Sequence, residues 1–268
     1  MKKNKMDELE LSQSAIDINE ELPVIEFNDV EMEFYMGSEK IDGLKEFFIK
    51  FIKGKIDRTK KKVLDGISFS VKKGESIAII GHNGAGKSTT LKIITGILKP
   101  TKGSVKVRGN VAPLLNLGAG FDYEATAKEN IYLNGAILGH SKKELEKKYN
   151  DIVEFSELHD YMNVPLKNFS SGMVARLGFA IAIDVEPDIL LIDEVLSVGD
   201  ENFRQKCSAK IKELKEKGAT FVVVSHSIGQ IKQLCQRAIW IENSKLVADG
   251  PVDEVCAKYE EYCKNNKH

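Results

Sequence analysis

The residues Gly81-His82-Asn83-Gly84-Ala85-Gly86-Lys87-Ser88 match the pattern G-x-x-x-x-G-K-[ST]. They follow an apolar run that ends at Ile80 and precede a helical pattern through Leu91, Ile94 and Leu98. A strand, a glycine-rich loop and a helix in this order form a phosphate-binding P-loop, whose backbone N–H groups surround phosphate oxygens. A chance glycine-rich turn is the alternative, and the flanking strand and helix argue against it. The sequence therefore predicts a nucleotide-binding protein.

Polar residues that follow apolar strands are candidates for the rest of a nucleotide site. In the P-loop, Lys87 is expected to reach the β- and γ-phosphates and the Ser88 hydroxyl to ligate Mg²⁺. Asp193, after an apolar strand, is expected to hold the same ion or its waters, and Glu194 to polarise the attacking water as a general base. His226 follows another apolar strand, where it can contact a γ-phosphate. Without a P-loop, Asp193 and Glu194 would be interpreted as a solvated strand end and His226 as a structural histidine. The P-loop favours the catalytic interpretation.

Length and composition narrow the class of protein. A chain of 268 residues can bury one large core, and a formal net charge of −1 argues against a general nucleic-acid binder. The four cysteines form no CxxC pair, so reduced thiols are expected rather than disulfides or a metal site. No apolar run is long enough to span a bilayer, and no signal peptide is evident at the start. A cytosolic protein that reaches a membrane through a partner is expected.

The pattern along the chain predicts an α/β fold. Residues 1–22 are polar and mostly acidic, which is typical of a disordered tail. Helical patterns dominate from about 125 to 182, with a break at Pro165. The continuous apolar runs 189–192 and 221–224 are typical of parallel strands covered on both faces. Further strands are predicted at residues 24–27, 66–71, 76–80 and 104–107.

Residues 44–62 form a basic amphipathic insertion between the first two predicted strands. The segment 45–62 holds eight Lys or Arg residues against Glu46 and Asp57. Apolar residues recur at helical spacing on one face: Leu44, Phe47, Phe48, Phe51 and Ile52. An ordinary surface helix with solvated lysines explains this pattern, and so does a helix that lies at an anionic membrane surface or against a partner protein.

Two other segments are candidates for nucleotide contact. Phe169-Ser170-Ser171-Gly172-Met173 stands where an apolar helix begins, and a helix start suits an anion. A serine-capped surface helix is the ordinary alternative. Phe34 and Tyr35, just after the first predicted strand, could stack on adenine or simply pack in the fold.

The order of these motifs is that of an ABC-type ATPase. The chain resembles this family over about residues 24–245. The motifs that carry the resemblance are, in chain order, the P-loop, residues 170–172, Asp193-Glu194, Ser197-Val198-Gly199-Asp200 and His226. The resemblance implies an α/β fold: a P-loop ABC-type ATPase core with a parallel sheet, an antiparallel N-terminal β-subdomain and an inserted helical subdomain. The implied divisions are a tail at 1–22, an ATPase domain at 23–245 with its helical subdomain at about 121–182, and a C-terminal helical extension at 246–268.

The resemblance also implies cofactors, partners and residue roles. ATP and Mg²⁺ are expected, with a second copy of the chain in a head-to-tail dimer and no nucleic acid. The signature motif, usually LSGGQ, would face ATP on the other subunit, while Ser197 and Asp200 belong to the D-loop and His226 is the switch histidine. Asn116 stands at the position of the Q-loop glutamine, where its shorter side chain puts direct Mg²⁺ contact in question. The expected ATP-binding residues are Phe34, Tyr35, Gly81, His82, Asn83, Gly84, Ala85, Gly86, Lys87, Ser88 and Thr89, with Ser170, Ser171, Gly172 and Met173 contributed in trans.

Several variants resemble one branch of the family. These variants are similar to the sequences of ATPase subunits that export lipid-linked polysaccharides such as teichoic acid, O-antigen or capsule. They are Ser-Ser-Gly-Met in the signature, the segments 117–121 and 129–135, and Val198-Gly199-Asp200 followed by Phe203. This implies an ATP hydrolase on the cytoplasmic face of a bacterial membrane, bound to a permease. The alternatives are an ABC ATPase of another transporter class, or a soluble ABC-type ATPase acting on DNA or ribosomes.

The resemblance also implies that the insertion 44–62 lies near the membrane. We therefore favour a helix at the anionic membrane surface or against the permease over an ordinary surface helix. Replacing Lys60, Lys61 and Lys62 with Glu would then impair export while ATP binding persists.

Overall fold

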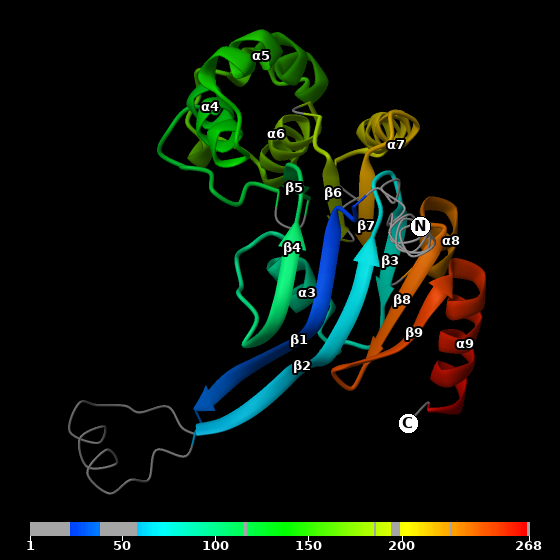
Figure 1. The fold of residues 1–268 in the computed structure, drawn as a ribbon. Helices are drawn as coiled ribbons and strands as arrows, with labels where there is room; N and C mark the ends of the chain where they lie inside the picture. Colours follow the sequence, from blue (N-terminus) through cyan, green and yellow to red (C-terminus); the bar gives the residue numbers. More distant parts are fainter. Residues whose placement is uncertain are drawn as a thin grey trace, which may run out of the picture.

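A computed structural model of the chain describes residues 22–37, 58–114, 117–184, 186–193, 199–225 and 227–266 (Figure 1). The strands are β1 (Ile25–Gly37), β2 (Arg58–Val71), β3 (Ser76–Ile80), β4 (Lys102–Val107), β5 (Val111–Pro113), β6 (Ile189–Asp193), β7 (Thr220–Val224), β8 (Arg237–Glu242) and β9 (Lys245–Pro251). The helices are α3 (Lys87–Ile94), α4 (Ala127–Ile137), α5 (Lys142–Ser156), α6 (Ser171–Asp184), α7 (Glu201–Glu216), α8 (Ile228–Leu234) and α9 (Val252–Asn265), with short 3₁₀ turns η1 (His159–Tyr161) and η2 (Leu166–Asn168).

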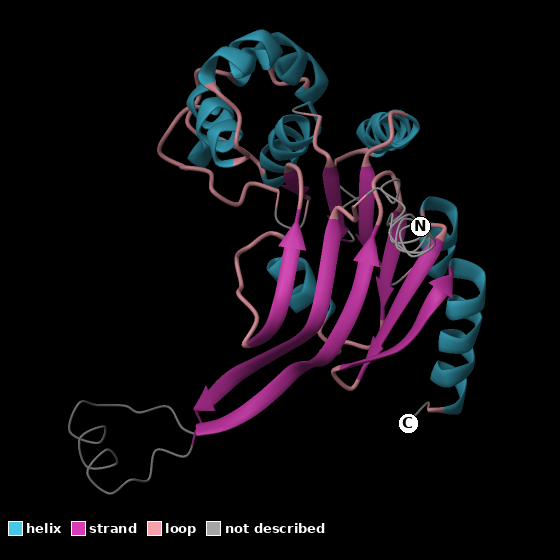
Figure 2. Cartoon of the chain, in the orientation of Figure 1, coloured by secondary structure: helices cyan, strands magenta, loops and turns pink. Residues whose placement is uncertain are grey.

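Two sheets form the body of the molecule (Figure 2). The six-stranded sheet has the order β5-β6-β7-β3-β8-β9; its first five strands run parallel, and β9 is antiparallel to β8. The three-stranded sheet has the order β2-β1-β4 and is antiparallel throughout. Both the predicted parallel core and the predicted antiparallel β-subdomain are confirmed.

The large sheet is covered on both faces, as its continuous apolar strands require. Alternate residues of one strand point to opposite faces. Ala78 and Ile80 of β3 join the core under α6, α7, α8 and α9, whereas Ile77 and Ile79 join the core shared with α3 and the three-stranded sheet. Packing on both faces therefore holds the strands of the large sheet in place, and with them the starts of the loops that follow these strands.

The helical insert has a small core of its own and stands at one end of the strands (Figure 1). Capping boxes start its first two helices: Thr126 with Glu129 for α4, and Ser141 with Glu144 for α5. The predicted break at Pro165 is where η2 begins, directly before the turn into α6. These helices lie in the region predicted as helical from about 125 to 182.

Some predicted boundaries are wrong. The basic insertion was expected to reach residue 62, but Arg58–Lys62 belongs to β2 and pairs with β1. The extension at 246–268 was expected to be helical, but residues 246–251 belong to β9, so α9 begins only at Val252. In both cases pairing with a neighbouring strand supplies backbone hydrogen bonds that local sequence does not reveal. Residues 1–21 and 38–57, which include most of the predicted tail and insertion, lie outside the described residues.

No helix in the described part of the chain has the length and apolar character that crossing a membrane requires.

Arg237 ties the two sheets together. Its guanidinium pairs with both carboxylate oxygens of Asp249, at 2.5 and 2.6 Å, joining β8 to β9. The same group donates to the Ser70 carbonyl of β2 at 2.9 Å and to Glu75 at 3.0 Å. The Arg237 side chain is 25% exposed, so water screens these contacts only in part.

We expect Arg237→Met to lower the free energy of unfolding by about 2 kcal/mol, because it leaves two carboxylates and a carbonyl without their donor. Arg204→Met is the matched control, since Arg204 pairs with Glu201 on an exposed helix turn; it should cost less than about 0.5 kcal/mol. Urea unfolding of both variants measures the difference. Equal losses would contradict a special role for Arg237.

Candidate functional site

The P-loop joins β3 to α3 and has the backbone shape that its glycines permit. Gly84 and Gly86 have φ values of 83° and 110°, in the left-handed region. A Cβ on Gly86 would lie 2.9 Å from the Val63 carbonyl oxygen, so the loop packs directly on β2, whereas one on Gly84 would meet no atom within 4 Å. The first turn of α3 carries no acidic side chain, so the positive end of this helix is available to an anion.

Lys87 is buried, at 7% exposure, and is held by the loop itself. Its ammonium donates to the carbonyl oxygens of Gly81 at 2.7 Å and His82 at 2.9 Å. The positive charge is therefore fixed within the loop, close to the backbone N–H groups that can surround a phosphate.

A hollow of about 360 Å³ brings the P-loop together with the ends of β6 and β7. Asp193 of β6 lines it with Ser88, as the sequence predicts, and Val224 of β7 forms another wall. The sequence interpretation missed Lys61 and Val63 of β2, which also line it. Only strand pairing could have revealed them, because more than twenty residues separate Lys61 from the lysine of the P-loop in sequence. The full lining is Lys61, Val63, Asn83, Gly84, Gly86, Lys87, Ser88, Thr89, Asp193 and Val224.

The oxygen atoms at this hollow fit a hard cation. A Ser88 hydroxyl and an Asp193 carboxylate are ligands that Mg²⁺ accepts, with phosphate oxygens and water completing its shell. No group of three or more His, Cys, Asp or Glu side chains among the described residues could hold a metal without such help. The donor set therefore suits an ion that arrives with a nucleotide.

The strand order explains why distant motifs share one edge. In the sheet β7 lies between β6 and β3, and Asp193 pairs with Val224. Parallel strands end at the same edge, so the segments leaving β3, β6 and β7 start side by side. Glu194 and His226 follow β6 and β7 in the sequence but lie outside the described residues, as do Asn116 and Ser197.

The register of β1 and β2 distinguishes the two aromatic candidates. The sequence predicted that Phe34 and Tyr35 follow the first strand, but both residues lie within β1. Phe34 pairs with Lys61, which lines the P-loop hollow, while Tyr35 pairs with Lys60, whose ammonium lies 5.4 Å from the Tyr35 ring centre. Cross-strand partners point to the same face of a sheet. Phe34 therefore shares the face of the P-loop, and Tyr35 points to the opposite face.

The signature segment forms the exposed start of α6. The Ser170 hydroxyl accepts a hydrogen bond from the Met173 N–H at 3.2 Å, which caps the helix. Ser170 and Ser171 are exposed. None of the residues 170–173 lines the hollow at the P-loop. In one chain these two candidate anion sites are thus separate.

Charged residues connect the signature helix to α7. Arg176 of α6 pairs with Asp200, and with Glu157 at 2.9 Å, while its guanidinium lies 4.7 Å from the Phe203 ring centre. Asp200 caps α7 by accepting from the Phe203 N–H at 3.0 Å. This backbone hydrogen bond, together with Arg176, lowers the pKa of Asp200 and keeps the carboxylate ionised.

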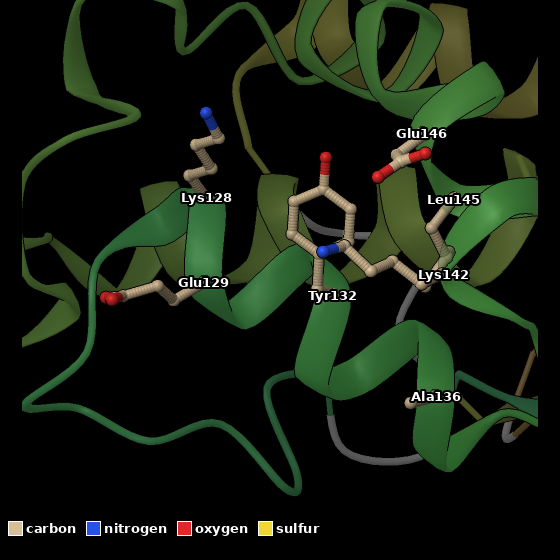
Figure 3. Close-up of a pocket in the computed structure, with 7 residues that line it drawn as sticks. All are labelled: Lys128, Glu129, Tyr132, Ala136, Lys142, Leu145 and Glu146. Atoms are coloured by element: carbon tan, nitrogen blue, oxygen red, sulfur yellow. The ribbon is translucent and has the colours of Figure 1, made fainter.

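A second hollow, of about 550 Å³, lies on the helical insert between α4 and α5 (Figure 3). Its rim mixes lysines and glutamates around Tyr132 (Figure 3). It contains no residue of the P-loop and none of the strand ends, so it is not part of the nucleotide site.

Sequence comparisons connect the chain to known proteins. The profile of the family described as ABC transporter matches residues 64–197. The chain is 44% identical over 245 residues to the O-antigen export system ATP-binding protein RfbB of Klebsiella pneumoniae, covering 89% of this chain and 98% of that protein. It is 41% identical over 243 residues to the teichoic acids export ATP-binding protein TagH of Lactiplantibacillus plantarum, covering 91% of this chain and 66% of that protein.

Solved structures share the fold. The structure of an ATP-binding subunit of an ABC transporter matches with a TM-score of 0.68 at 24% identity, covering 88% of this chain and 93% of the other. A dimeric ATP-binding cassette in a post-hydrolysis state, bound to ADP and Pi, matches with a TM-score of 0.66 at 23% identity. The match covers 85% of this chain and 98% of the other. With the family profile and the relatives above 40% identity, these findings show that the chain belongs to the ABC transporter family.

Proposed function

We propose that the chain is the ATP-binding and hydrolysing subunit of a bacterial ABC exporter that moves a lipid-linked polysaccharide across the cytoplasmic membrane. The observation that carries the nucleotide function is the hollow where Lys87, Ser88 and Asp193 meet. The polysaccharide class rests on the relatives, which are O-antigen and teichoic acid export proteins. The glycan would be of the O-antigen, teichoic acid or capsule type.

In this proposal the residues at the sheet edge divide the work of hydrolysis. The P-loop from Gly81 to Thr89 holds the phosphates, and Ser88 with Asp193 would hold Mg²⁺, which supplies charge neutralisation at the phosphate oxygens. Glu194 accepts a proton from the attacking water, whose oxygen forms a bond to the γ-phosphorus as the bond to the β–γ bridging oxygen breaks. His226 contacts the γ-phosphate. The products are ADP and phosphate.

Each site would be completed by a second copy of the chain. A helix N-terminus suits a phosphate anion, and Ser170 and Ser171 at the start of α6 are exposed, yet residues 170–173 do not line the P-loop hollow of their own chain. A head-to-tail dimer would bring Ser170, Ser171, Gly172 and Met173 to ATP bound by the partner. The Asp200–Arg176 pair would hold the D-loop, with Ser197, to the signature helix during closure.

We assign the permease contact to a groove between α3 and the helical insert. The groove has a volume of about 470 Å³. Ile97 and Ile137 line it and are 69% and 61% exposed, which is typical of a protein-binding surface. Ser88 and Asp193 border the same groove, so a permease segment seated there would respond to nucleotide. Contact with this partner would place the chain on the cytoplasmic face of the membrane.

Direct membrane contact through residues 44–57 remains part of the proposal, but the triple lysine test does not suit it. Lys61 lines the P-loop hollow, and Lys62 pairs with Glu31 of β1 and with Asp65 of β2. Replacing Lys60, Lys61 and Lys62 with Glu would thus disturb nucleotide binding as well as export. Charge reversals at Lys45, Lys50 and Lys53 separate the two effects, because they leave β2 unchanged.

We expect Lys87→Met to weaken ATP binding about a hundredfold, because it removes a buried charge fixed beside the phosphates. Lys73→Met, at an exposed turn between β2 and β3, is the matched control. Calorimetric titration with ATP measures affinity, and surface polysaccharide in a strain lacking the native gene measures export. Lys73→Met should restore export and Lys87→Met should not. Export restored by both variants would contradict the proposal.

The strand register yields a second prediction. Phe34→Ala should weaken ATP binding about tenfold, because it removes a ring that stacks on adenine. Tyr35→Ala should change the affinity less than about twofold, since its ring points to the other face of the strand. Titrations with ATP and with tripolyphosphate separate base from phosphate contacts. A larger loss for Tyr35→Ala would reverse the assignment.

A third prediction concerns the general base. Glu194→Gln should lower ATP turnover at least about a hundredfold while ATP still binds, because an amide cannot accept the proton. With ATP trapped, the variant should accumulate as a dimer in size-exclusion chromatography with light scattering. Near-normal turnover would refute the role of Glu194, and a monomer with ATP bound would refute the composite site.

A further inference from the structure

His82, the second residue of the P-loop, is bound to a buried carboxylate. Its Nδ1 lies 2.7 Å from Glu242 Oε2, and its backbone N–H donates to the same oxygen at 3.4 Å. Trp240 donates its indole N–H to this oxygen, also at 3.4 Å. Glu242 is only 9% exposed, and a buried carboxylate is costly unless such donors satisfy it.

The protonation states follow from this environment. Burial alone would raise the pKa of Glu242, but hydrogen bonds from the His82 side chain and backbone and from Trp240 lower the pKa below its usual value. An ionised carboxylate can only accept hydrogen bonds, so Nδ1–H of His82 is the donor and Glu242 is the acceptor of this hydrogen bond. The ring of His82 is therefore held in one orientation.

The other end of His82 is bound to the rest of the P-loop. Its carbonyl oxygen accepts from the Lys87 ammonium at 2.9 Å and from the Ala85 N–H at 3.1 Å. Residue 82 thus connects the buried Glu242 to the lysine expected to contact the phosphates. A displacement of His82 would move the carbonyl that positions Lys87.

Helix α9 covers the His82 ring. Tyr259 and Tyr262 meet it edge to face, with ring centres 5.8 and 5.7 Å away, and Cys263 Sγ lies 4.0 Å from its Nε2. The same tyrosines pack on Trp240, which stands beside Glu242. Val255, buried further along α9, fixes the helix to the core. Figure 1 shows this helix running beside β8 and β9.

We propose that His82 is a positioning residue of the nucleotide site and that α9 sets the affinity of the P-loop for ATP by holding the His82 ring against Glu242. This rests on the proposed nucleotide function of the loop. The C-terminal helix α9 is then a part of the ATP site that touches no phosphate. Its packing on the His82 ring affects the position of Lys87 through the His82 carbonyl group, which accepts from the Lys87 ammonium.

Calorimetric titration of the whole chain with ATP tests the assignment. His82→Ala should weaken binding about tenfold, the effect of losing a hydrogen bond to a charged group. His82→Asn, whose amide N–H can replace Nδ1–H, should restore the affinity to within about threefold of the wild type. Removing both ring contacts with Tyr259→Ala and Tyr262→Ala should weaken binding in the wild type but not further in His82→Ala, because both act through one residue. As a control for lost stability alone, Leu214→Ala, in the buried core under α7, should lower the melting temperature without changing the affinity for ATP.

The outcomes separate this inference from the proposed function. If the wild type binds no ATP, the proposed function fails. If it binds ATP and His82→Ala binds equally well, the positioning role is overturned. Additive losses in the combined variant would overturn the role of α9.

Alkylation offers a second measurement that needs no destabilising variant. Of the four cysteines, Cys207, Cys235 and Cys256 are buried and Cys263 is partly exposed. N-ethylmaleimide on Cys263 would push against the His82 ring and should weaken ATP binding at least about threefold. Treated Cys263→Ser protein reports any effect of the reagent elsewhere. An unchanged affinity after complete labelling of Cys263 would overturn the proposal.

Discussion

The backbone of the P-loop is held between two strands that leave no room for a side chain at Gly81 or at Gly86. A Cβ on Gly81 would lie 2.0 Å from the Ile241 carbonyl oxygen of β8, and one on Gly86 would lie 2.9 Å from the Val63 carbonyl oxygen of β2. The loop is thus fixed at its start by the large sheet and at its end by the three-stranded sheet. Because Arg237 ties these two sheets together, the stability of their junction also sets the shape of the phosphate site.

A second consequence of the architecture is that one chain keeps its two candidate anion sites apart. The P-loop lies at the carboxyl edge of the sheet, whereas the signature segment begins α6 in the helical insert. Arg176 and Asp200 connect that helix to α7 and so to the sheet. These contacts join the insert to α7. The groove proposed for the permease, between α3 and the insert, is bordered by Ser88 and Asp193, so a partner seated there would lie next to the proposed nucleotide site.

Much of the site could be predicted from the sequence because its chemistry lies in short contiguous motifs. A local sequence pattern was enough to find the P-loop, Asp193 with the strand before it, and the serines at the start of α6. The same reasoning gave wrong boundaries where strands pair over a long range in the sequence. Residues 58–62 look like part of a basic helix but pair with β1, and residues 246–251 pair with β8. Lys61 and Val63 reach the P-loop for the same reason, since strand pairing joins residues that no spacing rule connects.

The sequence by itself determined the class of fold, the nucleotide chemistry and the family. Few other kinds of protein combine a P-loop of glycines and a lysine with carboxylates that follow an apolar strand. Only the tertiary structure decided which aromatic side chain faces the P-loop, since the two faces of β1 are distinguished by its register with β2. It alone brought His82 to Glu242 and to Tyr259 and Tyr262, which are separated from it by 160 or more residues in the chain. Contacts of that range depend on how β8 and α9 pack against β3, and packing is a property of the whole fold.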